Sequence, residues 1–347
     1  MTDAYRTGLA ELPRERDAVL AIWRDSLGDP ARHAGKFDWF YLGCPFGQPL
    51  LQLLRHEAAA IGTCGVGARR MLWRGREIRA GLLADMAVDA RHRTLGPALM
   101  LQEALMAAAA DRFDLLYGFP NRKSLPVVQR LGYALLGEFS RHVRVLRHAE
   151  YLQGHMPRWL AALLGGALDA VRTVRDVLRL PSRRQAKAAW SEQADARMDA
   201  LWRSSSPHGD GLLGVHDAAL ARWRFDQSPL ADMRYLLVDD PRDGSLRAWF
   251  ACERRGRTMH VCDFWSERGV DGIEHGLALL LVRAARRTGC VSVTLECAAP
   301  VARMAGWRRA GFVLRESQPV VGKWLREEPD AAAVAQDWHL TEADADE

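Results

Sequence analysis

Three short motifs occur twice along the chain, in the same order and at similar spacing. The pairs are IWRDS at 22–26 and LWRSS at 201–205, WFYLGCP at 39–45 and WRFDQSP at 223–229, and RLGY at 130–133 and RAGF at 309–312. The middle pair fits W-x-[YF]-x-x-x-P. Tryptophan–arginine pairs and glycine–aromatic turns also recur by chance in arginine-rich chains, but chance does not account for the shared order. The repeat therefore predicts two copies of one domain.

The pattern of apolar residues predicts the same elements in each copy. A helix and strand-like runs come first, then a long helix, a buried strand, a short helix that ends at the glycine–aromatic turn, and a last strand that closes the copy. This order predicts an α+β fold, with a mostly antiparallel sheet flanked by helices. We expect domains at 1–148 and 190–326, joined by a helical linker at 149–189. The acidic tail at 327–347 is expected to be partly disordered, with Trp338 docking it.

The linker sequence predicts an amphipathic helix. Its apolar face consists of Leu160, Leu163, Leu164, Leu168, Val171, Val174 and Leu178. Arg172, Arg175 and Arg179 lie off that face, and Pro181 ends the helix. We expect a connector that packs on the two domains. Weak contact with an anionic membrane surface and a dimer contact are the alternatives, and the oligomeric state stays open.

Composition limits the class of protein. The 347 residues carry a formal net charge of +5, mostly from scattered arginines, which permits acidic ligands but does not indicate a nucleic-acid partner. None of the six cysteines forms a C-x-x-C pair, so we expect reduced core cysteines in a cytoplasmic protein. The N-terminus lacks the apolar core of a signal peptide, and Asp169 interrupts the apolar run at 159–171, which is too short to span a bilayer. No metal-ligand motif stands out.

The stretch MAVDARHRTLGPALMLQEAL, residues 86–105, ends an apolar strand in a basic loop and then opens a helix. A helix start carries partial positive charge and unpaired N–H groups, so it suits an anion. Gly96 lets the backbone approach a ligand closely, and Arg91 and Arg93 add charge. The loop therefore predicts an anion site, and several N–H donors in a small arc suit a pyrophosphate.

This order of elements resembles the GNAT superfamily of acyl-CoA-dependent N-acyltransferases. In that superfamily a strand ending in Val is followed by [RQ]-x-x-G-x-[GA], and here Val88 is followed by Arg93–Ala98. A strand, an Asn and a helix that ends in G-[FY] come next in the superfamily. They are matched by the strand at 114–119, by Asn121 and by Gly132–Tyr133.

The resemblance covers roughly residues 10–147, and a weaker version covers 190–326. It implies that the first copy binds acetyl-CoA or another acyl-CoA. The backbone of Met86–Val88 would pair with the pantetheine arm and polarise the thioester carbonyl. The implied cofactor-binding residues are Met86, Ala87, Val88, Arg91, Arg93, Thr94, Leu95, Gly96, Pro97, Ala98 and Asn121. Thr94 stands where the family often has glycine, and Pro97 has no N–H, so the loop offers one phosphate donor fewer.

The matching loop of the second copy, VDGIEHGLA at 270–278, departs further from the pattern. Ile273 stands at the arginine position, and Asp271 and Glu274 bring negative charge. Pro300 stands where Asn121 would be matched. We therefore expect a degenerate second copy that shapes the acceptor site or stabilises the first copy.

Catalytic residues are weakly marked. Acyl transfer needs a neutral amine and a proton for the leaving thiolate. Many members of the superfamily use a tyrosine four residues before the G-[FY] glycine as the acid, but Val128 stands there. Tyr117 and Tyr133 are substitutes by residue type, or else core aromatics. Asp85, on the strand that leads to Val88, is a candidate base, or else it fixes the neighbouring turn.

The sequence thus predicts a transferase, most simply an N-acetyltransferase that acts on an amino sugar, a small amine or a peptide amine. The W-x-[YF]-x-x-x-P elements and the closing DWHLTEADAD resemble acetyltransferases linked to bacterial polysaccharide assembly. A non-catalytic binding or scaffold protein of the same fold is the main alternative, favoured by Val128 and Pro97. A membrane-surface acyltransferase with a long-chain donor is the third.

Overall fold

The computed structural model describes residues 5–122, 124–182, 184–205, 211–230, 232–326, 334 and 337–346. The first copy contains β1 (Tyr5–Leu9), α1 (Arg16–Arg24), α2 (Pro30–Phe37), η1 (Asp38–Leu42), β2 (Leu50–His56), β3 (Ala59–Trp73), β4 (Arg76–Val88), η2 (Ala90–His92), α3 (Leu95–Ala109), β5 (Leu115–Gly118), α4 (Leu125–Arg130) and β6 (Ala134–Val145). The linker forms α5 (His148–Leu152) and α6 (Arg158–Arg179).

The second copy repeats this order of elements. It contains β7 (Lys187–Ser191), α7 (Arg197–Ser205), β8 (Leu212–Gly214), α8 (Ala218–Ala221), η3 (Arg222–Asp226), β9 (Met233–Asp239), β10 (Leu246–Arg255), β11 (Thr258–Ser266), η4 (Gly269–Asp271), α9 (His275–Arg287), β12 (Ser292–Ala298), α10 (Ala305–Arg309) and β13 (Val313–Trp324). The tail adds β14 (Trp338–Thr341) and η5 (Glu342–Asp344). The run from β2 to β6 matches the run from β9 to β13, which confirms the predicted tandem α+β architecture.

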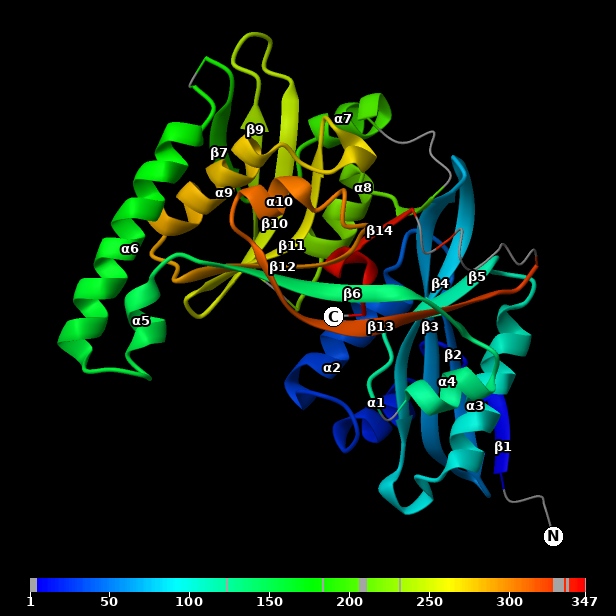
Figure 1. Cartoon of the computed structure of the whole chain (residues 1–347). Coiled ribbons are helices and arrows are strands. Elements are labelled where there is room, and N and C mark those ends of the chain that lie inside the picture. Colours follow the sequence, from blue (N-terminus) through cyan, green and yellow to red (C-terminus); the bar gives the residue numbers. More distant parts are fainter. Residues whose placement is uncertain are drawn as a thin grey trace.

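One continuous sheet joins the two copies (Figure 1). Its main strand order is β1-β2-β3-β4-β5-β13-β6-β12-β11-β10-β9-β7. β6, the last strand of the first copy, pairs with β12 of the second, and β13 pairs with β5 of the first. The expectation that a last strand closes its own copy is therefore wrong. The copies exchange their last strands because β6 and β13 pair with each other in the middle of the sheet.

The repeated W-x-[YF]-x-x-x-P motif makes a contact between the copies. In each copy it begins in a π-helical turn, η1 or η3. The rings of Trp39 and Trp223 stack with centroids 4.8 Å apart, and Trp39 Nε1 donates a hydrogen bond to the Trp223 carbonyl over 2.8 Å. β3 passes close beneath η1, since a Cβ at Gly65 would lie 2.0 Å from the Tyr41 hydroxyl. The motif thus has a structural role, because its buried aromatic rings join the two copies.

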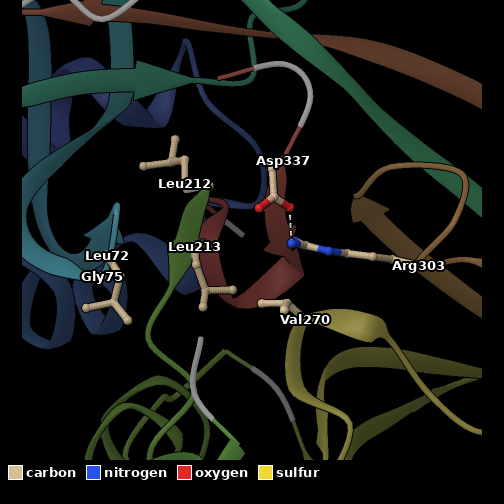
Figure 2. Close-up of a pocket in the computed structure, with 8 residues that line it drawn as sticks. Leu72, Gly75, Leu212, Leu213, Val270, Arg303 and Asp337 are labelled. Carbon is tan, nitrogen blue, oxygen red and sulfur yellow. Dashed lines mark hydrogen bonds and ion pairs between the residues drawn. The ribbon is translucent and has the colours of Figure 1, made fainter. Parts of the chain in front are cut away.

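The end of the tail is a core element. β14 pairs with β12 and β8, and Trp338 is buried with Leu340 in a cluster drawn from both copies. Figure 2 shows Arg303 reaching toward Asp337, with which it forms an ion pair. The same guanidinium donates to the Trp338 carbonyl over 3.0 Å, and the cavity beside it measures about 10 Å³, room for about one water.

The expected docking of the tail through Trp338 is therefore confirmed, and the expected partial disorder does not extend to residues 337–346. The apolar side chains of β14 are buried between the copies, and this burial orders a segment whose composition is acidic. The rest of that prediction, for 327–333, 335, 336 and 347, lies outside the described residues.

The linker helix α6 turns its apolar face to solvent. Its buried residues are Ala161 and Gly165, and a Cβ at Gly165 would lie 2.3 Å from the Ala149 nitrogen of α5. The connector expected to pack on the domains does so through its polar side, where Asp176 pairs with Arg144 of β6 at 2.9 Å. In the part of the chain that the structure describes, no helix is long and apolar enough to cross a bilayer.

Replacing Trp338 by alanine tests the placement of the tail. The indole is 4 % exposed, so Trp338→Ala is expected to lower the free energy of unfolding by about 3–5 kcal/mol. Urea unfolding followed by circular dichroism measures this loss. The control is Trp159→Ala, because that indole is 66 % exposed and its loss is expected to change stability by no more than about 0.5 kcal/mol. Equally small effects in both variants would contradict a core position for the tail.

Candidate functional site

β4 and β5 diverge at the centre of the first copy. They pair in parallel where Ala80–Leu82 meets Leu115–Tyr117. β5 then ends at Gly118, whereas β4 continues to Val88 and stays paired with β3 on its other side. Among the described strands, none pairs with the second edge of Met86–Val88. An open edge of this kind can accept an extended ligand through backbone hydrogen bonds.

A bulge in β4 sets the direction of Asp85. The register between β3 and β4 shifts between Thr63 and Gly65, and Asp85 has a φ of +51°. The Thr63 hydroxyl donates to the Asp85 carbonyl over 2.9 Å and accepts from Trp23 Nε1 over 3.1 Å. Bulges commonly re-aim a side chain. Here the bulge directs the Asp85 carboxylate toward α2 and η1.

Three side chains gather around the Asp85 carboxylate. Lys36 Nζ donates to Oδ1 over 2.8 Å, and the Tyr41 hydroxyl donates to Oδ2 over 2.7 Å. The Asp346 carboxylate lies 3.1 Å from the same Lys36 Nζ. The Lys36 and Asp85 side chains are 7 % and 2 % exposed. One buried ammonium thus faces two carboxylates, which is an arrangement that favours protonation of one of them.

The surroundings of Asp85 raise the pKa of its carboxyl group. Burial, and after it the Asp346 carboxylate, raises the pKa of Asp85 to about 6 against the opposing effects of Lys36 and Tyr41. Burial and the Asp85 carboxylate also raise the pKa of the Tyr41 phenol well above its usual value, so this hydroxyl remains a donor. A carboxyl group that titrates near pH 6 is suited to proton transfer.

A cavity of about 150 Å³ opens beside this cluster. Asp85, Lys36 and Asp346 line it together with Trp23 and His33. His33 Nε2 is buried and has no hydrogen-bond partner among the described residues. The cavity wall therefore carries an acid–base group, a cation and an unsatisfied imidazole nitrogen.

A second cavity of about 410 Å³ adjoins the first, since Arg32 and Leu230 line both. Its walls come from both copies and from the tail. The buried Arg224 guanidinium lines it and donates to the carbonyls of Ala343 and Glu342 over 3.2 and 3.3 Å. The second copy and η5 thus form one side of the space that leads to Asp85.

The basic loop between β4 and α3 is held by its own residues. Asp89 accepts from the Arg91 N–H over 2.9 Å and pairs with the Arg91 guanidinium at 3.0 Å. Arg93 Nε and Nη2 donate to the Val88 carbonyl over 3.1 and 3.0 Å. The turn-fixing contact considered for Asp85 is thus made by Asp89. Both arginines have structural contacts in addition to their positive charge.

The N-terminus of α3 is exposed. Thr94 is its N-cap residue and makes no side-chain capping bond, and Leu95 is half-exposed. A Cβ at Gly96 would meet no atom within 4 Å, and the φ of Gly96 is not positive, so neither packing nor backbone conformation requires glycine there. Pro97 and Ala98 are buried in the first turn. The first N–H groups of α3 therefore remain open to a ligand, with Pro97 contributing none.

The remaining predicted residues have structural contacts. Tyr117 is fully buried, and its hydroxyl donates to the Asp344 carbonyl over 2.7 Å. Tyr133 is buried, its hydroxyl has no partner among the described residues, and burial raises its pKa. The Asn121 side chain accepts from the Ser124 N–H over 3.1 Å at the start of α4. Asp85 thus directly precedes the open edge of β4 along the chain, and no described hydrogen bond joins it to Tyr117 or Tyr133.

The corresponding site of the second copy is filled. β14 pairs with β12 at Cys297, and the Thr341 hydroxyl donates to Asp263 of β11 over 2.9 Å. At the N-terminus of α9, a Cβ at Gly276 would lie 3.2 Å from the Pro181 ring at the end of the linker. Tail and linker therefore occupy the two positions that stay open in the first copy.

Sequence reasoning missed Lys36, Tyr41 and Asp346. Tyr41 occupies the [YF] position of the repeated motif, where the second copy has Phe225, so a hydroxyl present in one copy alone was the available signal. Lys36 carries no local pattern, and Asp346 lies in the tail expected to be disordered. In the described part of the chain, no group of three His, Cys, Asp or Glu side chains is placed to hold a metal ion.

Several solved structures with a similar fold are named as N-acyltransferases. A GCN5-related N-acetyltransferase from Anabaena variabilis has a TM-score of 0.64 at 10% identity, covering 93% of this chain and 73% of that one. A probable N-acyltransferase from Enterococcus faecalis has a TM-score of 0.63 at 9% identity, covering 92% and 72%. Saccharomyces cerevisiae N-myristoyltransferase with bound myristoyl-CoA has a TM-score of 0.55 at 11% identity, covering 95% and 85%.

No protein-family model and no curated protein matches the sequence. The likeness to solved structures therefore concerns the three-dimensional arrangement, at sequence identities of 9–11%. The chain has the fold of the GCN5-related N-acetyltransferases, built from two copies of which the first keeps an open strand edge.

Proposed function

We propose that the chain is an acyl-CoA-dependent N-acyltransferase that uses acetyl-CoA. The observation that carries the proposal is the edge of Met86–Val88, which no described strand pairs and which is flanked along the chain by buried Asp85 and by the exposed N-terminus of α3. The similar structures described as N-acetyltransferases, and the one with bound myristoyl-CoA, support the same reaction class.

In this proposal the cofactor lies across the first copy. The pantetheine arm adds to the edge of Met86–Val88 like a further strand, and Asn121 contacts the arm. The pyrophosphate meets the N–H groups of Leu95 and Gly96, where the helix dipole favours negative charge. Arg91 and Arg93 add positive charge to the same loop.

The acceptor amine enters the cavity beside Asp85. The Asp85 carboxylate takes a proton from the ammonium group, and the neutral nitrogen attacks the thioester carbonyl carbon. A C–N bond forms, the C–S bond breaks, and the thiolate of CoA takes the second proton of the amine. A backbone N–H of Met86–Val88 polarises the carbonyl oxygen.

The acceptor is an amino sugar, a small amine or a peptide amine. Two adjoining cavities of about 150 and 410 Å³ leave space for more than the reacting amine. Arg32, Arg224 and Glu253 give the larger cavity a polar wall. A link to bacterial polysaccharide assembly rests on the sequence resemblance of the W-x-[YF]-x-x-x-P motif and the closing DWHLTEADAD.

A non-catalytic binding or scaffold protein is the second candidate. Val128 stands at the position of the superfamily's tyrosine acid, and the burial of Tyr117 and Tyr133 favours a structural role for both. A thiol-release assay with acetyl-CoA and a library of amines separates the two candidates. Turnover supports the transferase, whereas binding of CoA without turnover across the library supports the scaffold.

Gly96→Asp tests the pyrophosphate position. An acidic residue in the first turn of a helix is compatible with folding, and no atom lies within 4 Å of the new Cβ. Repulsion of the pyrophosphate is expected to weaken CoA binding roughly tenfold to several-hundredfold in calorimetry. The control is Gly154→Asp, another glycine with open space around it, which is expected to bind CoA normally. Unchanged affinity in Gly96→Asp would contradict the site.

Asp85→Asn tests the base. Because the pKa of Asp85 is about 6, kcat/KM is expected to rise with pH through about 6 and then level off. Asp85→Asn should remove this acid limb and lower kcat by roughly 10²–10⁴-fold. Asp263→Asn makes the same change at a buried aspartate of the second copy, and the acid limb should persist there. If the pH–rate profile of Asp85→Asn keeps the whole acid limb, Asp85 is not the base.

Tyr41→Phe gives an independent readout of the same site. Loss of the 2.7 Å hydrogen bond to the carboxylate is expected to raise the pKa of Asp85, because that bond favours the charged form. The acid limb of the pH–rate profile should move up by roughly one pH unit. If the acid limb of the Tyr41→Phe profile stays in place or moves to lower pH, the group that titrates is not the carboxylate bonded to Tyr41.

A further inference from the structure

The outward face of α6 is apolar along the whole helix. Its side chains are between 50 and 80 % exposed at Trp159, Leu163, Leu164, Val171, Val174, Val177 and Leu178. At about 100° per residue these positions cover roughly 140° of the helix surface. Figure 1 shows α6 along an outer edge of the molecule, with α5 and α9 beside it. A contiguous apolar surface of this kind marks an interaction site.

The helix is fixed in this orientation by its opposite side. Asp169 accepts from the His148 backbone N–H over 3.1 Å and pairs with the His148 ring at 2.5 Å. Asp176 pairs with Arg144 at 2.9 Å and with Arg286 of α9 at 3.2 Å. Rotation of α6 to bury its apolar face would break these contacts. The exposed face is therefore a feature of the folded protein.

The same contacts leave α6 with a positive charge. Asp169 and Asp176 are its acidic residues, and both are paired with cationic or polar groups of the protein. Arg158, Arg175 and Arg179 are exposed and have no carboxylate partner among the described residues. A second copy of α6 placed on this face would offer these arginines no acidic partner, because Asp169 and Asp176 are engaged on the opposite side. An anionic surface is complementary to it.

The breadth of the face also favours a flat partner. A two-helix seam uses a narrow stripe with charged residues on both sides. Here apolar residues occupy the whole outer side, Trp159 lies at one end, and Arg175 and Arg179 lie along one margin. These features are typical of helices that lie in the plane of a membrane interface.

We propose that α6 docks the protein on an anionic lipid bilayer. Its apolar side chains enter the interfacial region, and Arg175 and Arg179, on the margin of the apolar face, contact lipid phosphates. This attachment is peripheral and is independent of the acyl-transfer proposal.

Vesicle flotation of the full chain tests the proposal. We expect binding to phosphatidylcholine–phosphatidylglycerol vesicles that is roughly tenfold or more tighter than binding to phosphatidylcholine alone, and that weakens at high salt. Leu163→Glu combined with Val174→Glu should abolish flotation, and both positions are exposed enough for the variant to fold. The control is Val313→Glu combined with Leu314→Glu on β13, two exposed apolar residues outside α6.

Two results would overturn the proposal. One is a wild-type chain that stays unbound to both kinds of vesicle, including the case in which sedimentation velocity shows a dimer that Leu163→Glu/Val174→Glu dissociates. The other is flotation that the α6 variant and the β13 control lose to the same extent. Flotation lost in the α6 variant alone, with the secondary structure intact by circular dichroism, supports it.

Discussion

The pairing of β6 with β13 is the interaction on which the rest of the structure depends. It places the last strand of each copy in the sheet of the other, so neither half is complete alone. Buried arginine–tryptophan contacts also join the copies, and each copy supplies one arginine and one tryptophan. The Arg224 guanidinium lies 5.4 Å from the Trp39 ring, and Arg69 lies 4.9 Å from the Trp223 ring. The cavity beside Asp85 also depends on both halves, because Leu230 of the second copy and Asp346 of the tail line it together with residues of the first copy.

The two copies share the same arrangement of elements, but their corresponding sites are covered differently. In the second copy, β14 and the end of the linker occupy the strand cleft and the helix N-terminus. In the first copy, the edge of Met86–Val88 and the start of α3 remain open. The tail that fills the second cleft also carries Asp346 to Lys36. One segment therefore closes the second copy and completes the polar cluster of the first.

Features of the fold and of the site that have a local sequence pattern could be predicted, and those that depend on tertiary contacts could not. The repeated motifs gave the tandem architecture, and the basic loop located the open helix N-terminus. The exchange of β6 and β13 could not be read from sequence, because the strand pattern is the same whichever copy a strand joins. Lys36 and Tyr41 reach Asp85 through tertiary contacts that leave no spacing rule. The periodicity of α6 showed an amphipathic helix, but which side packs depends on distant partners such as Arg144.

Hydrogen–deuterium exchange with and without CoA shows which copy holds the cofactor. Exchange is expected to slow over residues 86–98, where the edge of β4 and the start of α3 gain hydrogen bonds to the ligand. Residues 262–278 of the second copy should be unchanged, because β14 and the linker already cover that site. Protection of 262–278 with none at 86–98 would show instead that the cofactor binds to the second copy.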